Sequence, residues 1–216
     1  MNTMHTRNRV YFFSTAFFLS FGLTFLVAQE GSEKVSDADQ QQIVKMAEGI
    51  RKAIVTLPQY GVFDYLHFGI KNRKVTLFGY ASRPILKSSA ENVTKKVPGV
   101  ESVDNQIKVL PLSPNDDRIR AAVYFNIYSY PMLQKYTNNR GPGRMGPSVA
   151  RRAGGITNDP PVGWHAISII VENGNVILKG VVDNASDFAV AEMRANITSG
   201  VFSVDNDLEV VGGKQK

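Results

Sequence analysis

Two stretches of this chain are copies of one another. Residues 75–110 read VTLFGYASRPILKSSAENVTKKVPGVESVDNQIKVL, and residues 176–211 read VILKGVVDNASDFAVAEMRANITSGVFSVDNDLEVV. The run Ser-Val-Asp-Asn stands at 102–105 in the first copy and at 203–206 in the second. A repeat of this kind indicates that one small structural unit occurs twice. The shared residues are mostly glycines and apolar side chains, so the repeat preserves a fold rather than a catalytic centre.

Hydrophobic spacing predicts the order helix, strand, strand, helix, strand in each copy. In the first copy, Ser36 caps the expected leading helix and Pro58 marks its end. Alternating patterns then predict strands at 63–70 and 74–81, joined by a short turn. The matching turn in the second copy is Asn173-Gly174, which is the strongest short-range signal for a hairpin.

The second copy has a leading helix of its own. Ser113 is its expected cap, Pro114 suits its first position, and Pro131 is expected to end it. Between this helix and the next strand the chain inserts residues 131–165, where the first copy has only the short link 58–62. A connection of that length without regular structure is usually either disordered or functional.

Four glycines recur at matched positions of the two copies. Gly79 and Gly180 lie inside strand patterns, where glycine normally weakens a strand. This indicates either a bulge or a close approach of a helix backbone to the sheet, and we expect the helix approach. Gly99 and Gly200 are expected to stop the second helix of each copy in a left-handed conformation. The candidate caps at the start of these second helices are Ser82 and Asn184.

The N-terminus has the layout of an export signal. Arg7 and Arg9 precede an apolar run that ends at Ala28, and the polar Gln29 follows. We therefore expect a signal peptide at 1–28, with an uncleaved membrane anchor as the alternative. Either way the remainder is exported, to the periplasm or beyond the inner membrane. The chain contains no cysteine, so it relies on packing alone and has neither a lipid-modified cysteine nor a thiolate zinc site.

The expected organisation after the signal is a linker and two modules. The linker covers 29–40, the first module 41–110, the second module 111–212 with its insert at 131–165, and a tail 213–216.

These features resemble the BON-domain family, whose members are small export-associated modules. The resemblance implies an α+β fold of two tandem αββαβ modules, each a small three-stranded sheet packed against two helices. It also implies binding modules for phospholipid or membrane surfaces, linked to envelope integrity and osmotic protection, without an established catalytic centre. The positions that carry the family motif are Gly79, Gly180, Gly99, Gly200, Val103, Val204, Asn105 and Asn206. The chain departs from the lipoprotein branch by lacking a cysteine, and from compact members by its insert.

The net charge of +6 is unevenly spread. Residues 41–110 contain eleven Lys or Arg against five Asp or Glu, and the insert adds further arginines. An excess of this kind attracts an anionic partner. In an exported protein the accessible anions are phospholipid head groups or acidic polysaccharide rather than nucleic acid. Each basic residue near an anionic membrane contributes about 1 kcal/mol.

The candidate contact surface combines the insert with aromatic residues, since aromatic side chains prefer the membrane interface. Its expected members are Arg140, Arg144, Arg151, Arg152, Trp164, Tyr124 and Tyr128. The alternatives are a solvated loop with Trp164 buried against the sheet, and aromatic residues used for packing of the modules. A protein-interaction module that docks on an envelope partner or self-associates is the second hypothesis for function.

Catalytic residues are not expected. His67 and His165 are isolated from carboxylate pairs, and Gly141–Gly146 matches a dinucleotide-binding pattern by letters but lacks its strand and helix context. Asp104-Asn105 and Asp205-Asn206 are expected to cap the turn into the last strand rather than to bind calcium. We therefore expect no cofactor and no metal.

Overall fold

The computed structural model describes residues 37–138, 161 and 164–212. One compact unit spans Ser36–Lys216 and contains both repeats. The expected signal peptide, the linker up to residue 36, the four arginines of the insert and the tail lie outside the described residues.

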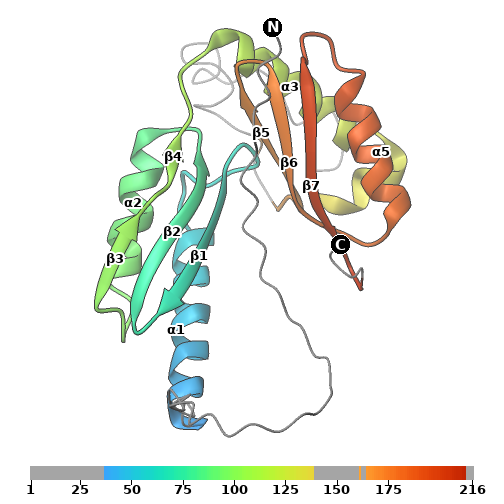
Figure 1. The fold of residues 1–216 in the computed structure, drawn as a ribbon. Helices are drawn as coiled ribbons and strands as arrows, with labels where there is room; N and C mark the ends of the chain where they lie inside the picture. The colour runs from blue at the N-terminus through green and yellow to red at the C-terminus, as the bar shows by residue number, and fades with distance from the viewer. Residues whose placement is uncertain (1–36, 139–160, 162–163, 213–216) are drawn as a thin grey trace, which may run out of the picture. The chain divides into compact units, whose positions relative to one another are not determined.

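The first module is a small sheet covered by two helices (Figure 1). Strand β2 is central, pairs antiparallel with β1 and pairs parallel with both β3 and β4. Because β3 and β4 occupy successive lengths of the same edge, they form one strand position that is interrupted at Gln106 and Ile107. The elements are α1 (Asp37–Val55), β1 (Tyr65–Lys71), β2 (Lys74–Ala81), α2 (Pro84–Lys95), β3 (Ser102–Asn105) and β4 (Lys108–Val109).

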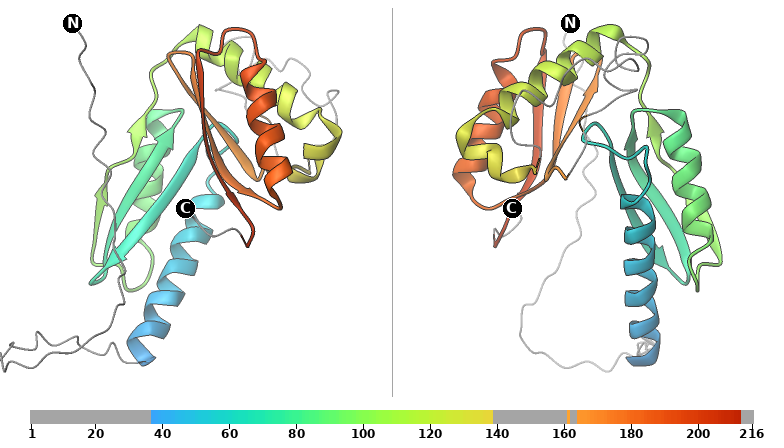
Figure 2. Two further views of the ribbon diagram at one scale, coloured as in Figure 1. Left: turned by 45° about the vertical axis from the view of Figure 1, so that its right-hand side comes forward. Right: turned by 180° about the vertical axis from the view of Figure 1, so that it is seen from behind.

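The second module repeats this topology with an uninterrupted last strand. Its sheet order is β5-β6-β7, with the first pair antiparallel and the second parallel. In each module the two helices lie on the same face of the sheet (Figure 2), which confirms the predicted α+β modules. The elements are α3 (Pro114–Tyr128), the 3-10 helix η1 (Pro131–Tyr136), β5 (Ile167–Glu172), β6 (Asn175–Val182), α5 (Ala185–Asn196) and β7 (Ser203–Val210).

Both hairpins close with two residues in the left-handed region. Asn72 and Arg73 have φ values of 50° and 61°, and Asn173 and Gly174 have values of 52° and 78°. Positive φ at both central positions matches the twist of the flanking strands. The first copy therefore uses an arginine where glycine is usual, and the Arg73 Nε donates to the Gly99 carbonyl at 3.1 Å.

Two of the predicted helix caps are confirmed, and one is wrong. The side chains of Ser113 and Asn184 accept hydrogen bonds from the backbone N–H three residues later. Ser82 is not a cap, because α2 begins after Arg83 and the Ser82 N–H donates to the buried carboxylate of Asp64 at 2.6 Å. Pro131 follows the end of α3 as expected, but it also begins η1, so the insert starts with regular structure.

The strand glycines are required by a neighbouring strand, not by a helix. Gly79 has a φ of +112°, and a Cβ atom there would lie 1.9 Å from the Tyr65 carbonyl oxygen. Gly180 has a φ of +130°, and its Cβ would lie 1.9 Å from the Ala166 carbonyl oxygen. The predicted approach of a helix is therefore wrong, because the backbone that comes close belongs to the start of the adjacent strand.

The other repeated glycines lie in turns that follow the second helices. Gly99 and Gly200 have positive φ values of 93° and 90°. Helix α2 ends at Lys95, and the turn from Val97 to Val100 places Gly99 at the position that needs a positive φ. The left-handed conformation is as predicted, although it occurs beyond the helix end.

The repeated asparagine connects the last strand to the second helix. Asn105 Nδ2 donates to the Lys87 carbonyl at 2.9 Å and to Glu91 Oε2 at 3.0 Å. In the second module Asn206 Nδ2 donates to the Phe188 carbonyl at 3.0 Å and to Glu192 Oε2 at 3.3 Å. Each asparagine Oδ1 also accepts from the backbone two residues later. Each asparagine therefore caps the turn and also connects the last strand to the second helix. The second role uses Glu91 and Glu192, which explains why this glutamate is repeated as well.

Each helix-covered face encloses a hydrophobic core, and the second core takes residues from the first module. The first is built around Met46, Ile50, Val75, Leu77 and Leu86. The second core contains Val62 and Phe63 in addition to residues of its own helices and sheet. The prediction that strand β1 starts at Phe63 was therefore wrong by two residues, because Phe63 turns away to fill the neighbouring core.

Candidate functional site

Two aromatic residues of the expected contact surface are in the core. Tyr124 and Tyr128 are each 4% exposed, and the Tyr128 hydroxyl donates to the Ile167 carbonyl at 2.6 Å. Burial raises the pKa of Tyr128 well above its ordinary value. A side chain enclosed in this way cannot touch a membrane, so both residues leave the candidate surface. The buried face of α3 is wider than its sequence pattern indicated, because η1 and Phe63 cover residues that do not face the sheet.

The two ends of the insert are joined at its base. Thr137 and His165 form an antiparallel bridge, and the Ala166 N–H donates to the Tyr136 carbonyl at 2.9 Å. The Trp164 N–H donates to Asn138 Oδ1 at 2.9 Å. Trp164 is 57% exposed, so the alternative in which it is buried against the sheet is wrong.

Lys135 and Tyr136 hold a buried carboxylate beside this base. Lys135 Nζ lies 2.7 Å from Oδ2 of both Asp183 and Asp187, and the Tyr136 hydroxyl donates to Asp187 at 2.6 Å. Burial acts to raise the pKa of Asp187, but the hydrogen bonds from Lys135 and Tyr136 outweigh it and the pKa is lowered. The hydrogen bonds of Lys135 to Asp183 and to Asp187 raise the pKa of Lys135.

Replacing Lys135 by glutamine is expected to lower the melting temperature at pH 7, with a smaller effect at acid pH. A carboxyl whose pKa is lowered by folding stabilises the protein above its ordinary pKa of about 3.9, and this contribution is lost as the pH falls. Without Lys135 that contribution is reduced, so the difference between the two proteins narrows towards pH 3. Calorimetry at pH 7, 5 and 3 measures it, with Lys96→Gln as the control. A difference that is constant with pH would contradict this assignment.

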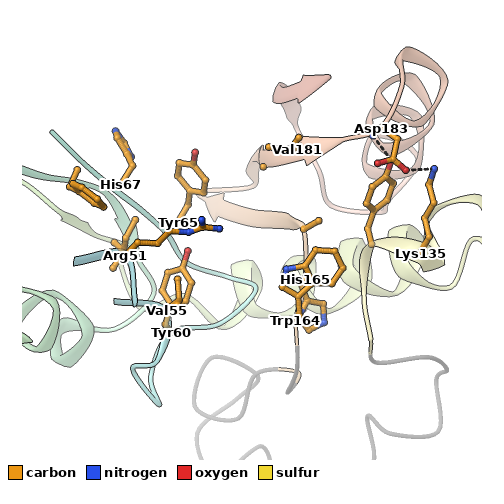
Figure 3. Close-up of a pocket in the computed structure, with 15 residues that line it drawn as sticks. Arg51, Val55, Tyr60, Tyr65, His67, Lys135, Trp164, His165, Val181 and Asp183 are labelled. Carbon is orange, nitrogen blue, oxygen red and sulfur yellow. Dashed lines mark hydrogen bonds and ion pairs between the residues drawn. The ribbon is translucent and has the colours of Figure 1, made fainter. Parts of the chain in front are cut away.

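A cleft of about 700 Å³ lies next to the base of the insert (Figure 3). One wall comes from the end of α1 and from β1, including Arg51 and Tyr65. The other comes from Trp164, His165 and the Val181 region of β6. A neighbouring hollow of about 440 Å³ shares Val55, Tyr60, Trp164 and His165 with it.

The two histidines take part in ring contacts. His165 Nε2 lies 3.0 Å from the Tyr124 hydroxyl, and His67 stacks on Phe78 with ring centroids 5.4 Å apart. Burial and the nearby charge of Lys179 lower the pKa of His67. The described part of the chain contains no group of three or more His, Asp or Glu side chains placed to hold a metal ion. Within the same residues, no helix combines the length and apolar character that crossing a membrane requires.

The repeated helix-strand-strand-helix-strand order, the two sheets and the glycine-dependent strand contacts define a protein of two similar α+β modules. Each module matches the model of the BON domain, at residues 69–111 and at residues 156–212. The chain therefore contains two BON-type modules.

The comparison with solved structures finds CdsD, a structural protein of the Type III secretion system of Chlamydia trachomatis. Its C-terminal domain is 15% identical, with 77% of this chain and 98% of that chain covered and a TM-score of 0.25. A second CdsD structure is 16% identical, with 76% and 90% covered and a TM-score of 0.23. A search of curated proteins finds no match.

Proposed function

We propose that this chain is an exported, non-enzymatic binding protein of the cell envelope that contacts anionic phospholipid and supports envelope integrity under osmotic stress. The proposal rests on the two BON-type modules and places the protein in the periplasm or on the outer side of the inner membrane. Such modules describe a fold, so the function has to be argued from a surface of this chain.

The observation that carries the proposal is the exposed Trp164 at the base of an arginine-rich insert. The bridge between Thr137 and His165 brings the two ends of the insert together. In the sequence, Arg140, Arg144, Arg151 and Arg152 all lie between these two ends. Tryptophan prefers the membrane interface, and basic residues add about 1 kcal/mol each near an anionic surface. Met132, 44% exposed, adds apolar surface on η1.

Flotation of the purified protein with phosphatidylglycerol and with phosphatidylcholine vesicles, across a salt series, tests this function. We expect binding to the anionic vesicles alone, with loss at high salt because the contact is electrostatic. Neutralising the four arginines of the insert to glutamine is expected to weaken binding at least about tenfold, since up to about 4 kcal/mol is removed. The matched control neutralises four exposed lysines of the first module, namely Lys52, Lys71, Lys74 and Lys96. Equal binding by both variants would remove the insert from the proposal.

A protein-interaction role is the second candidate, and exposed apolar residues on two neighbouring helices favour it. Phe125 on α3 is 48% exposed, Met193 on α5 is 49% exposed, and Ile197, which caps the C-terminal end of α5, is 60% exposed. The two helices are joined there by a hydrogen bond from Arg194 Nε to the Asn126 carbonyl. Exposed apolar surface of this kind is common where proteins meet. Cross-linking of the native envelope that traps one stable partner, together with no flotation on either vesicle, would favour this role.

A further inference from the structure

The cleft beside Trp164 has the size and composition of a small-molecule site. Its volume of about 700 Å³ lies within the range of about 300–1,000 Å³ that is typical of ligand pockets. Apolar and aromatic side chains line most of it, with a small number of polar groups. A pocket of this composition binds a ligand through ring faces and fixes its orientation through a few polar contacts.

Arg51 supplies an unneutralised positive charge in this cleft. Figure 3 shows its side chain extending from α1 between the Tyr60 and Tyr65 rings into the cleft. The other nearby cations are neutralised, since Lys135 pairs with two aspartates and Lys179 pairs with Asp207 at 2.7 Å. Among the described residues Arg51 has no carboxylate partner. The planar guanidinium can therefore bind a carboxylate through two parallel hydrogen bonds.

Aromatic rings flank Arg51 on both walls. Tyr65 lies 5.7 Å from His67, ring centroid to ring centroid, on one wall. Trp164 stands on the other wall, where hydrogen bonds with Asn138 hold its backbone in place. A large exposed ring whose backbone is already fixed can bind a ligand at low entropic cost. These rings offer flat apolar faces to a partner that is itself ring-shaped.

Several backbone donors in or next to the cleft are already hydrogen-bonded, which leaves fewer main-chain groups for an extended peptide. The Ile169 N–H donates to the Val62 carbonyl at 2.8 Å, and the Ala166 N–H donates to the Tyr136 carbonyl. The Leu66 N–H bonds to Tyr60, whose pKa burial raises to about 12. A peptide added as a strand depends on free main-chain groups at the sheet edge. A ligand of this cleft therefore relies mainly on side chains.

We propose that this cleft binds an acidic saccharide, a sugar ring that carries a carboxylate. The carboxylate pairs with Arg51, and the C–H face of the ring stacks on Trp164 and Tyr65. The Tyr65 hydroxyl lines the same cleft and offers a hydrogen bond to a sugar hydroxyl. This site shares Trp164 with the proposed membrane contact, but its charge comes from Arg51 and not from the arginines of the insert.

Trp164 is the one tryptophan of the chain, so its fluorescence reports directly on the cleft. The test is a titration of the purified protein with tetragalacturonate and with its fully methyl-esterified, uncharged form. We expect a saturable change in Trp164 fluorescence with the acid and a much weaker response to the ester. Arg51→Gln is expected to weaken binding of the acid at least about tenfold, as loss of a charge-assisted bidentate pair does. Arg51→Lys is expected to recover part of the affinity, and Lys52→Gln, which removes an exposed charge on the same helix, should bind as the parent does.

Four results would overturn the inference. The first is the absence of a fluorescence change with the acid at millimolar concentration. The second is an equal response to the acid and the ester, and the third is binding of the acid that Arg51→Gln leaves unchanged. The fourth is an Arg51-dependent change with phosphatidylglycerol vesicles or an acidic peptide in place of the saccharide. The insert-arginine variant separates this site from the membrane contact, since it should lose vesicle binding and keep saccharide binding.

Discussion

Replacing Gly180 by alanine is expected to lower the free energy of unfolding by about 3 kcal/mol or more. The residue has a φ of +130°, a conformation that side chains rarely adopt. An added Cβ would also lie 1.9 Å from the Ala166 carbonyl oxygen. This contact is with backbone, so it cannot be relieved by a change of rotamer, and strands β5 and β6 would have to separate locally.

Urea denaturation followed by circular dichroism measures this effect, and the chain provides a matched control. Gly69 lies on β1 in the same type of hairpin, but its nearest neighbour would be a Phe78 side-chain atom at 3.9 Å from the added Cβ. Gly69→Ala is therefore expected to be neutral or to stabilise the protein by up to about 1 kcal/mol. Gly79→Ala, with the geometry of Gly180, should destabilise as Gly180→Ala does. A Gly180→Ala protein as stable as the Gly69→Ala protein would contradict this explanation of the repeated glycine.

Local features of this fold could be predicted from the sequence because they depend on neighbours in the chain. The caps at Ser113 and Asn184 bond to residues three positions later, and the Asn173-Gly174 turn is set by two residues. The position of Gly180 was equally visible, but the strand that approaches it was not. The partner of Gly180 is the Ala166 carbonyl across the hairpin, and residue spacing does not show which backbone comes closest.

The candidate site was harder to predict because it depends on contacts between distant segments. Tyr124 and Tyr128 were expected on the surface, because the apolar pattern of α3 predicted packing against the sheet of its own module only. Their burial follows from η1 and Phe63, which a helical pattern cannot reveal. In the sequence, Arg51 is one of eleven basic residues at 41–110, and no pattern distinguishes it from the others. Its place in a cleft follows from the insert base that carries Trp164, and no signal in the sequence connects the two.

Replacing Phe63 by alanine is expected to destabilise the protein by about 3–5 kcal/mol, the usual cost of removing a fully buried phenylalanine ring. Phe63 is 1% exposed and belongs to the second core. Its ring meets that of Tyr124 edge to face, with centroids 6.3 Å apart. The adjacent Val62 carbonyl accepts a hydrogen bond from the Ile169 N–H at 2.8 Å, so the segment is fixed to β5 by its backbone as well.

Urea denaturation with Trp164 fluorescence as the probe tests whether the second module loses this stability. Trp164 lies beside the second core, so its transition should shift to lower urea by the full amount in Phe63→Ala. Phe63→Leu, which keeps most of the buried volume, should recover most of the stability. Phe125→Ala, which truncates an exposed ring of α3, should change stability by no more than about 0.5 kcal/mol.

The shift of the Trp164 transition in Phe63→Ala shows whether the stability of the second module depends on the first. Phe63 precedes the second repeat by about fifty residues in the chain, yet its ring completes the hydrophobic core of that repeat. A small module buries too little apolar surface to tolerate the loss of one such ring. The link between α1 and β1 therefore acts as part of the second module's core. If Phe63→Ala instead left the Trp164 transition unchanged, the second core would be complete without it, and the two repeats would unfold as independent modules.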